Sequence, residues 1–519
     1  MSEKTKKMDP HQTEHAERIK HTSHHADHAD HADQANHQAN QRTIPATQTT
    51  EAQRSALMAI SPVDGRYADR TSHLREIFSE YALIRSRCEI ELDYLLALEE
   101  TNTFAPLLTE ERARIQNLRN SLDEYAALRV KNIELTTKHD VKACEYFLIE
   151  ALHLREPNRI HFGLTSEDVN NLAWTSLLRS YRDTVQIPQL KTLAQALAER
   201  VREGRESVFP TRTHGQFASP STAGKEMAVF LTRLCNGLDN LAALRFRGKL
   251  NGATGTFAAS ISAAPNYDWR AFSRRFVESL GFEFNGCTTQ IEDHDSWAQY
   301  FNITRMILNV VTDLDQDMWL YLMQGFYRET AVAGEVGSST MPHKINPIRF
   351  ENSEGNSQFA CAQLSFLADK LTRSRMQRDL SDSTVTRNMG TAFAHAHLAV
   401  AETMSGLARL SLNRDYCKKV VAEHPEVLAE PVQTILRRFG AENPYEALKD
   451  LTRGRTDTGD AFAPENLTIF ANTTGVSETH KKEVVALLQS LKPELYFGAA
   501  TAVADEALAR CAHWTRKEI

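Results

Sequence analysis

The sequence predicts an all-α protein built around long helices that pack against one another. Residues 295–324 contain neither glycine nor proline, and their apolar residues cover more than one side of a helix about 45 Å long. Residues 224–247 place apolar side chains at steps of three and four, and residues 355–376 and 388–412 show the same pattern. Few segments alternate apolar and polar residues, so strands are expected to be rare. A helix that is apolar on several sides needs several partners, which predicts a bundle.

Composition divides the chain into a tail and three predicted helical domains. Residues 1–50 repeat a His-Ala-Asp triplet and hold almost no large apolar side chains, so they are expected to form a disordered, histidine-rich tail. An N-terminal helical domain is predicted for residues 51–156, a central long-helix bundle for 157–412 and a C-terminal helical domain for 413–519. Such a tail could bind divalent transition metals loosely, but no zinc-type spacing occurs, and a solvated tail is the simpler interpretation.

The overall composition excludes several classes of protein. The 519 residues carry a formal net charge of -7, which gives no general attraction to nucleic acid or to anionic membranes. No apolar run is long enough to span a bilayer, and the N-terminus lacks the apolar stretch of a signal peptide. The seven cysteines are scattered without a Cys-x-x-Cys pair, so reduced thiols in a cytoplasmic protein are expected.

The segment GSSTMPHKINP, residues 337–347, is the most informative motif of the chain. Its two prolines forbid a helix through it, and it brings two hydroxyls, Ser338 and Ser339, close to Lys344 and Asn346. Removing a proton next to a carboxylate builds negative charge that cations and amide donors must meet. The loop therefore suits proton abstraction from a succinate-like substrate.

Two further motifs supply histidines. His214 lies in TRTHGQ between Pro210 and Pro220, on a short constrained segment before a helix, and His139 lies in TTKHDV between Lys138 and Asp140. Histidine suits proton transfer near neutral pH, although a lone histidine is more often structural. Asp140 could set the tautomer of His139.

Two other motifs could hold anions. Thr165 and Ser166 in TSEDVNN are typical of the start of a helix, where backbone N–H groups bind carboxylates. Arg378, Ser383 and Arg387 in RDLSDSTVTRN could form a forked phosphate site, although a solvated charged turn has the same composition.

Near the beginning of the helical region, Arg66 and Tyr67 in SPVDGRY offer a further cation and an aromatic face on which a base could stack. The sequence contains no phosphate-binding glycine loop, no dinucleotide fingerprint and no helical metal-ligand motif.

Together these motifs resemble the fumarase/aspartase superfamily of lyases. SPVDGRY, TT-x-HDV, TSED-x-NN, TRTHGQ, GSSTMPHK-x-NP and RDLSDST-x-x-RN occur in the order typical of one family within it, the adenylosuccinate lyases in their bacterial form, over roughly residues 55–500. Two residues depart from that family's usual pattern. Lys138 stands where the relatives usually have Asn, and Phe217 where they usually have Pro.

The resemblance implies a carbon–nitrogen lyase of purine nucleotide biosynthesis that releases fumarate from succinyl-nucleotides without a metal or other cofactor. It implies Ser338 as the base, with Ser339 as the alternative, and His214 as the acid. Further residues would support the chemistry or bind substrate: Arg66, Tyr67, Lys138, His139, Asp140, Thr165, Ser166, Gln290, Lys344, Asn346, Asn352, Arg378, Ser383 and Arg387. It also implies a homotetramer whose active sites are shared between subunits.

Other functions are compatible with parts of the sequence. The nearest alternative is a lyase of the same superfamily that releases fumarate from a different adduct. A non-enzymatic helical scaffold would usually have lost a catalytic position, whereas His139, His214, Ser338 and Lys344 are all present. A metal-handling protein would rest on the tail alone, which is a small part of the chain.

Overall fold

The computed structural model describes residues 50–330, 341, 344–452 and 462–516. The candidate bases Ser338 and Ser339, and the predicted tail except for its last residue, lie outside the described residues. The chain separates into two compact units, residues 1–58 and 59–519. In the first unit the structure describes helix α1 (Glu51–Leu57), which begins with a capping box of Thr50 and Gln53.

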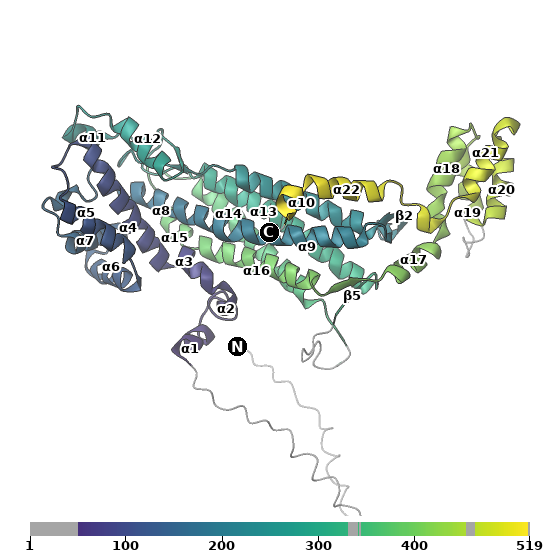
Figure 1. Ribbon diagram of the computed structural model, residues 1–519, viewed down its shortest axis with the longest axis horizontal. Helices are drawn as coiled ribbons and strands as arrows, with labels where there is room; N and C mark the ends of the chain where they lie inside the picture. Colours follow the sequence, from purple (N-terminus) through teal and green to yellow (C-terminus); the bar gives the residue numbers. More distant parts are fainter. Residues whose placement is uncertain (1–49, 331–340, 342–343, 453–461, 517–519) are drawn as a thin grey trace, which may run out of the picture. The chain divides into compact units, whose positions relative to one another are not determined.

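The second unit is helical almost throughout, which confirms the predicted all-α fold (Figure 1). Within its described residues, six α-helices precede the long bundle in the sequence: α2 (Ala68–Thr71), α3 (Arg75–Phe78), α4 (Glu80–Ala97), α5 (Thr109–Asn120), α6 (Glu124–Thr137) and α7 (Asp140–Leu152). The bundle and its attachments follow: α8 (Ser166–Tyr181), α9 (Ile187–Gly204), α10 (Ala223–Ala243), α11 (Ala258–Ala263), α12 (Trp269–Ser279), α13 (Asp295–Met323), α14 (Ile348–Leu371), α15 (Ser381–Thr386) and α16 (Met389–Leu407).

The described C-terminal part holds shorter helices: α17 (Arg414–Ala422), α18 (Ala429–Arg438), α19 (Pro444–Thr452), α20 (Pro464–Thr473), α21 (Glu478–Gln489), α22 (Ala500–Arg510) and α23 (Ala512–Thr515). Single turns of tighter helix connect several elements: η1 (Ser72–Leu74), η2 (Leu98–Thr101), η3 (Pro157–Arg159), η5 (Pro425–Leu428) and η7 (Pro493–Leu495). The segment η4 (Arg182–Gln186) is a π-helical turn between α8 and α9.

Strands are rare, as predicted, and those within the described residues form two-stranded sheets. β1 (Val208–Thr213) and β2 (Gln216–Thr222) form an antiparallel hairpin, and β5 (Tyr327–Glu329) pairs antiparallel with β6 (Leu410–Leu412). β3 (Arg247–Gly248) pairs parallel with β4 (Glu283–Phe284). The predicted helix over 388–412 was therefore too long, because its last residues leave α16 and pair with β5.

Helices α13 and α14 form the centre of the bundle and run antiparallel. At one end the carbonyl oxygen of Leu371 lies 3.2 Å from Nδ1 of His294, and at the other Trp319 donates to Glu351 over 3.1 Å. Helix α14 begins before the predicted 355–376 segment, because polar residues such as Glu351 and Asn352 hide the periodicity of its first turns. The helix predicted for 295–324 is confirmed as the continuous, 29-residue α13.

Buried apolar side chains form three clusters among the described residues. The largest fills the bundle, where Trp297, Tyr300 and Phe393 are almost fully buried. A second lies among α4 to α7, and a third among α18 to α21. The division of the chain into three domains stays a prediction.

A fully buried ion pair fastens the start of α8 to the segment after β3. Nζ of Lys249 lies 3.0 Å from Oδ1 of Asp168, and neither side chain is exposed. The Asp168 carboxylate also accepts the backbone N–H groups of Thr165, Asn251 and Gly252 at 2.9 to 3.1 Å. Because both charges are buried, removing one partner leaves the other uncompensated.

Replacing Lys249 should therefore destabilise the protein strongly. We expect Lys249→Met to lower the free energy of unfolding by about 3–5 kcal/mol, measured by urea denaturation. The matched control is Lys419→Met, which removes an exposed pair with Glu423 and should cost at most about 1 kcal/mol. A similar, small loss for both variants would contradict the role assigned to the buried pair.

A second buried carboxyl makes the stability of the bundle depend on pH. Burial raises the pKa of Asp315 well above its ordinary value, while Thr403 and Ser353 hydroxyls oppose the shift. The folded chain therefore keeps a proton that the unfolded chain releases above about pH 3.9, so folding loses stability as pH rises from there toward the folded pKa.

Asp315→Asn replaces the titrating carboxyl by an amide, so the pH dependence of stability that Asp315 causes should disappear. The melting temperature of the variant, relative to that of the original chain, should rise as pH is raised from about 5 to about 8. Asp369→Asn, an exposed position on α14, is the control that should show no such trend. Parallel curves for Asp315→Asn and the original chain would mean that Asp315 is ionised in the fold.

Candidate active site

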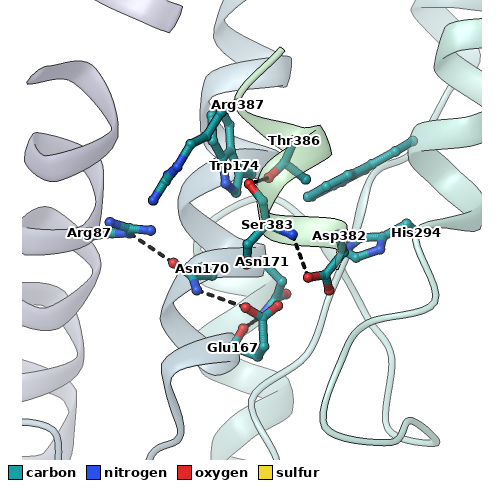
Figure 2. A pocket seen from close by; sticks show the side chains of 11 residues that line it. Arg87, Glu167, Asn170, Asn171, Trp174, His294, Asp382, Ser383, Thr386 and Arg387 are labelled. Carbon is teal, nitrogen blue, oxygen red and sulfur yellow. Dashed lines mark hydrogen bonds between the residues drawn. The ribbon is translucent and has the colours of Figure 1, made fainter. Parts of the chain in front are cut away.

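A polar pocket lies where α4, α8, the start of α13 and α15 meet (Figure 2). Its lining includes acidic and basic side chains beside two tryptophans: Arg87, Glu167, Asn170, Asn171, Trp174, His294, Trp297, Asp382, Ser383, Thr386 and Arg387. Two of these, Ser383 and Arg387, belong to the predicted phosphate motif. The pocket is therefore a candidate binding site for the anionic part of a substrate.

Arg378 completes the basic side of this region. Its Nη2 donates to Oγ of Ser383 over 3.2 Å, and its Nη1 pairs with Glu167 at 2.7 Å. Burial raises the pKa of Asp382, the nearby Arg378 guanidinium opposes this, and the Glu167 carboxylate adds to it. The structure thus brings Arg378, Ser383 and Arg387 together around one helix turn, α15.

Asp140 joins two arginines at the edge of the pocket. Its Oδ2 accepts from Arg87 at 2.8 Å and from Arg387 at 2.9 Å. Burial opposes ionisation of Asp140, but Arg87, a backbone N–H and Arg387 outweigh it and lower the pKa of the carboxyl to about 2. Asp140 therefore stays ionised at neutral pH and orients the Arg387 guanidinium.

His139 precedes α7 and is half exposed. Its Nδ1 accepts the N–H of Lys142, which caps the helix and places the proton of the neutral ring on Nε2. The carboxylate of Asp140 is bound by the arginines and lies 3.8 Å from Nδ1, so it does not set the tautomer as the sequence suggested. Lys138 is exposed and has a φ of 53°, which lets it end α6.

The predicted carboxylate-binding residues lie at the start of α8 and in a neighbouring loop. Thr165 is the N-cap residue and Ser166 the first residue of α8, whose position the Asp168–Lys249 pair fixes. Gln290 donates through Nε2 to the carbonyl of Ala253 over 3.1 Å, and its backbone N–H donates to Gln377. Gln377 precedes Arg378 in the sequence, so the loop that contains Gln290 lies beside the predicted phosphate motif.

Arg66 and Tyr67 lie elsewhere, beside the first turns of α14. Tyr67 donates to Oδ1 of Asn352 over 3.4 Å, and the Arg66 guanidinium carbon lies 6.0 Å from the Tyr67 ring centre. Asn352 in turn donates to the buried carboxylate of Glu402, which also pairs with Arg70 and Arg349. Lys344, which is exposed, and Asn346 precede α14, so they belong to this part of the chain.

His214 occupies the tip of the β1–β2 hairpin. His214 and Gly215 have φ values of 53° and 78°, which form the two-residue turn typical of a tight hairpin. The sequence motif correctly indicated a constrained segment before a helix, because α10 begins directly after β2. The turn leaves the imidazole exposed.

Helix α13 separates His214 from the polar pocket. His294 and Trp297 at its N-terminal end line the pocket, while Gln324 at its C-terminal end accepts a hydrogen bond from Arg212 of the hairpin. At 1.5 Å per residue, the 29 residues of α13 span about 43 Å. Within one chain, the structure does not bring His214 to Arg378, Ser383 and Arg387.

Several residues of the pocket were not named as candidates from the sequence. Glu167, Asn170 and Asn171 lie inside the TSEDVNN motif, so the motif itself was the available signal. The sequence around Arg87 contains no such signal, because Arg87 lies in the middle of α4. Its place in the site follows from its hydrogen bonds to Asn170 and Asp140, both at 2.8 Å. Its Nη1 is buried without a hydrogen-bond partner among the described residues.

No cluster of three or more histidine, cysteine, aspartate or glutamate side chains suited to a metal ion occurs in the described ranges. Among the helices that the structure describes, none combines the length and apolar character needed to cross a bilayer.

The fold is shared with solved structures of low sequence identity. A fumarate lyase from Mesorhizobium sp. BNC1 superposes with a TM-score of 0.67 at 17% identity, over 84% of this chain and 97% of that one. The 3-carboxy-cis,cis-muconate lactonizing enzyme from Pseudomonas putida gives a TM-score of 0.65 at 19% identity, over 86% and 98%. These likenesses show the fold.

Sequence comparison is more specific. The chain is 43% identical to adenylosuccinate lyase of Escherichia coli K12 over 465 residues, covering 87% of this chain and 99% of the relative. It is 41% identical to adenylosuccinate lyase of Haemophilus influenzae over 462 residues, covering 88% and 99%. Residues 65–362 match the family described as lyase, and residues 374–497 match the adenylosuccinate lyase C-terminal family. The chain therefore belongs to the adenylosuccinate lyase family of the fumarase/aspartase superfamily.

Proposed function

We propose that this enzyme cleaves adenylosuccinate into AMP and fumarate in purine nucleotide biosynthesis. The same site would split the succinyl-carboxamide ribotide intermediate, SAICAR, into AICAR and fumarate, because both substrates carry the same succinyl-amine group and a phosphate. Membership of the family supports this reaction. The observation that carries the proposal is the convergence of Arg378, Ser383 and Arg387 beside the polar pocket.

The proposed chemistry is a β-elimination. Ser338 takes a proton from the succinyl carbon next to a carboxylate, with Ser339 as the alternative base. The electron pair left on that carbon forms the double bond of fumarate as the carbon–nitrogen bond breaks, and His214 protonates the departing nitrogen. Lys344 and backbone N–H groups stabilise the charge that develops on the carboxylate. No cofactor is required, since the leaving group needs only a proton.

The other candidate residues would bind the substrate. Thr165, Ser166, Gln290, Lys344 and Asn346 would hold the succinyl carboxylates, and the start of α8 offers backbone N–H groups for this purpose. Arg66, Tyr67, Arg378, Ser383 and Arg387 would hold the nucleotide. The remaining candidates, Lys138, His139, Asp140 and Asn352, would contact the substrate or orient the groups that do.

We further propose that each active site combines residues of different subunits. The separation of His214 from the pocket by the length of α13 supports this, because one chain alone leaves the acid about 40 Å from the proposed phosphate site. Arg66 and Tyr67 lie near the same end of α13 as His214, since Glu351 beside Asn352 contacts Trp319. A neighbouring chain running antiparallel would bring the separated groups together.

Exposed apolar side chains on α13 and α14 fit such an assembly. Ile348, Phe359 and Phe366 follow one another at steps that place them on one side of α14. Helix α13 exposes Met306, Leu320 and Met323 in the same way. Exposed apolar side chains along one side of a helix are typical of an interface, and we propose a homotetramer whose central helices form a shared core.

The seven free cysteines of the described chain fit a reducing compartment, and we place the enzyme in the cytoplasm. The direct test of the activity is to follow fumarate and AMP release from adenylosuccinate by the purified protein. Absence of turnover, together with cleavage of a different succinyl adduct, would favour another lyase of the same superfamily instead.

Arg378→Ala tests the proposed phosphate site. Because a hydrogen bond to a charged group contributes about 1.5–3 kcal/mol, the KM for adenylosuccinate should rise roughly 10- to 100-fold. Arg375→Ala is the matched control, since Arg375 lies on the same loop with 86% of its side chain exposed and should leave KM nearly unchanged. An unaltered KM in Arg378→Ala would remove this residue from the phosphate site.

A further inference from the structure

The hairpin that carries His214 is held by an aromatic stack around Phe217. The guanidinium carbon of Arg212 lies 3.8 Å from the centre of the Phe217 ring. The imidazole of His424 lies with its centre 3.6 Å from the same ring centre, and the two planes are inclined by 28°. Two groups at these distances cannot share one face of the ring, so Arg212 and His424 lie on opposite faces.

Arg212 connects this stack to the turn. Its Nη1 donates to the carbonyl oxygen of Gly215 over 3.0 Å, and its Nε donates to Gln324 at the end of α13. His214 adopts a positive φ, a conformation that costs energy for a residue with a side chain. The turn therefore depends on contacts that hold it, and the Arg212–Gly215 bond is one of them.

The other side of the stack connects the hairpin to the segment after α17. His424 shares a hydrogen bond with Glu426 at 2.7 Å. Farther along β2, Ser219 hydrogen-bonds to Glu430, whose carboxylate also accepts from Tyr496 over 3.1 Å. Residues 424–430 thus contact the first half of β2, next to the turn, at Phe217 and Ser219.

We propose that Phe217 and His424 are positioning residues that set the orientation of the His214 imidazole for proton transfer. This rests on the proposed function, in which His214 protonates the leaving nitrogen. Neither side chain needs to touch the substrate, and both act through Arg212 and the turn.

The test compares Phe217→Leu with Phe217→Tyr in the full-length enzyme. Leucine fills similar volume but cannot stack, so kcat for adenylosuccinate should fall about tenfold while KM changes by less than about twofold, because the substitution removes both the aromatic and the cation contact of Phe217. Tyrosine keeps the ring and should retain most of the turnover. A loss in kcat alone indicates misplacement of the acid after substrate has bound.

Phe439→Leu is the matched control. Phe439 also lies beside an arginine and a histidine, Arg438 at 4.9 Å and His480 at 5.5 Å, and it packs against the apolar cluster among α18 to α21. Its replacement should leave kcat unchanged. Equal losses for Phe217→Leu and Phe439→Leu would indicate a general effect on stability and would overturn the proposal.

Other outcomes also decide the question. Normal kcat in Phe217→Leu, an equal loss in Phe217→Tyr, or a rise in KM alone would each contradict a positioning role. If Phe217→Leu does not fold, His424→Leu removes the other half of the stack and should lower kcat about threefold or more; an unchanged kcat there overturns the proposal. Absence of turnover in the unaltered enzyme would instead reject the proposed function, which separates the two failures.

Discussion

The length of α13 is the constraint on which the proposed shared site depends. The helix contains 29 residues without a break, so its two ends lie about 43 Å apart. One end contributes His294 and Trp297 to the polar pocket, and the other receives the hairpin that carries His214. A rigid helix cannot shorten this separation. Any site that uses both groups must therefore draw on more than one chain.

Around the pocket, charge is balanced by fixed partners. Asp140 orients Arg387, Glu167 pairs with Arg378, and the buried Asp168–Lys249 pair holds the start of α8 in place. If the pocket binds the substrate's phosphate as proposed, these groups need little reorganisation, because fixed partners already hold them. The hairpin is arranged differently, because its exposed tip is oriented by the stack of Phe217 with Arg212 and His424.

The fold was predictable because its signals are local. An uninterrupted apolar pattern over 295–324 is sufficient to indicate a long helix, and several such helices indicate a bundle. The end of α16 was predicted too late, since the pairing of β6 with β5 depends on a segment far away in sequence. The start of α14 was also predicted incorrectly. Polar residues of its first turns contact Tyr67 and Trp319 instead of an apolar core, so they carry no apolar periodicity.

The candidate site was only partly predictable for the same reason. Motifs placed Arg378, Ser383 and Arg387 near one another in sequence, and they are close in space. Arg87 lies in an ordinary helical segment and becomes part of the site only through Asp140 and Asn170. The roles proposed for Ser338 and Ser339 stay predictions that rest on the signature motif alone.

The most direct test of a shared site combines two variants at opposite ends of α13. His214→Ala removes the proposed acid, and His139→Ala alters the end that adjoins Asp140 and Arg387. His214→Ala alone should lose turnover by about 100-fold or more, as expected for a general acid, and His139→Ala alone should also lose most of its turnover. Mixed tetramers, isolated by two different affinity tags after co-expression, should recover about one quarter of the original activity, because random mixing leaves that share of sites with both histidines. Mixed tetramers as inactive as their parents would mean that each chain builds its site alone, which would contradict the account.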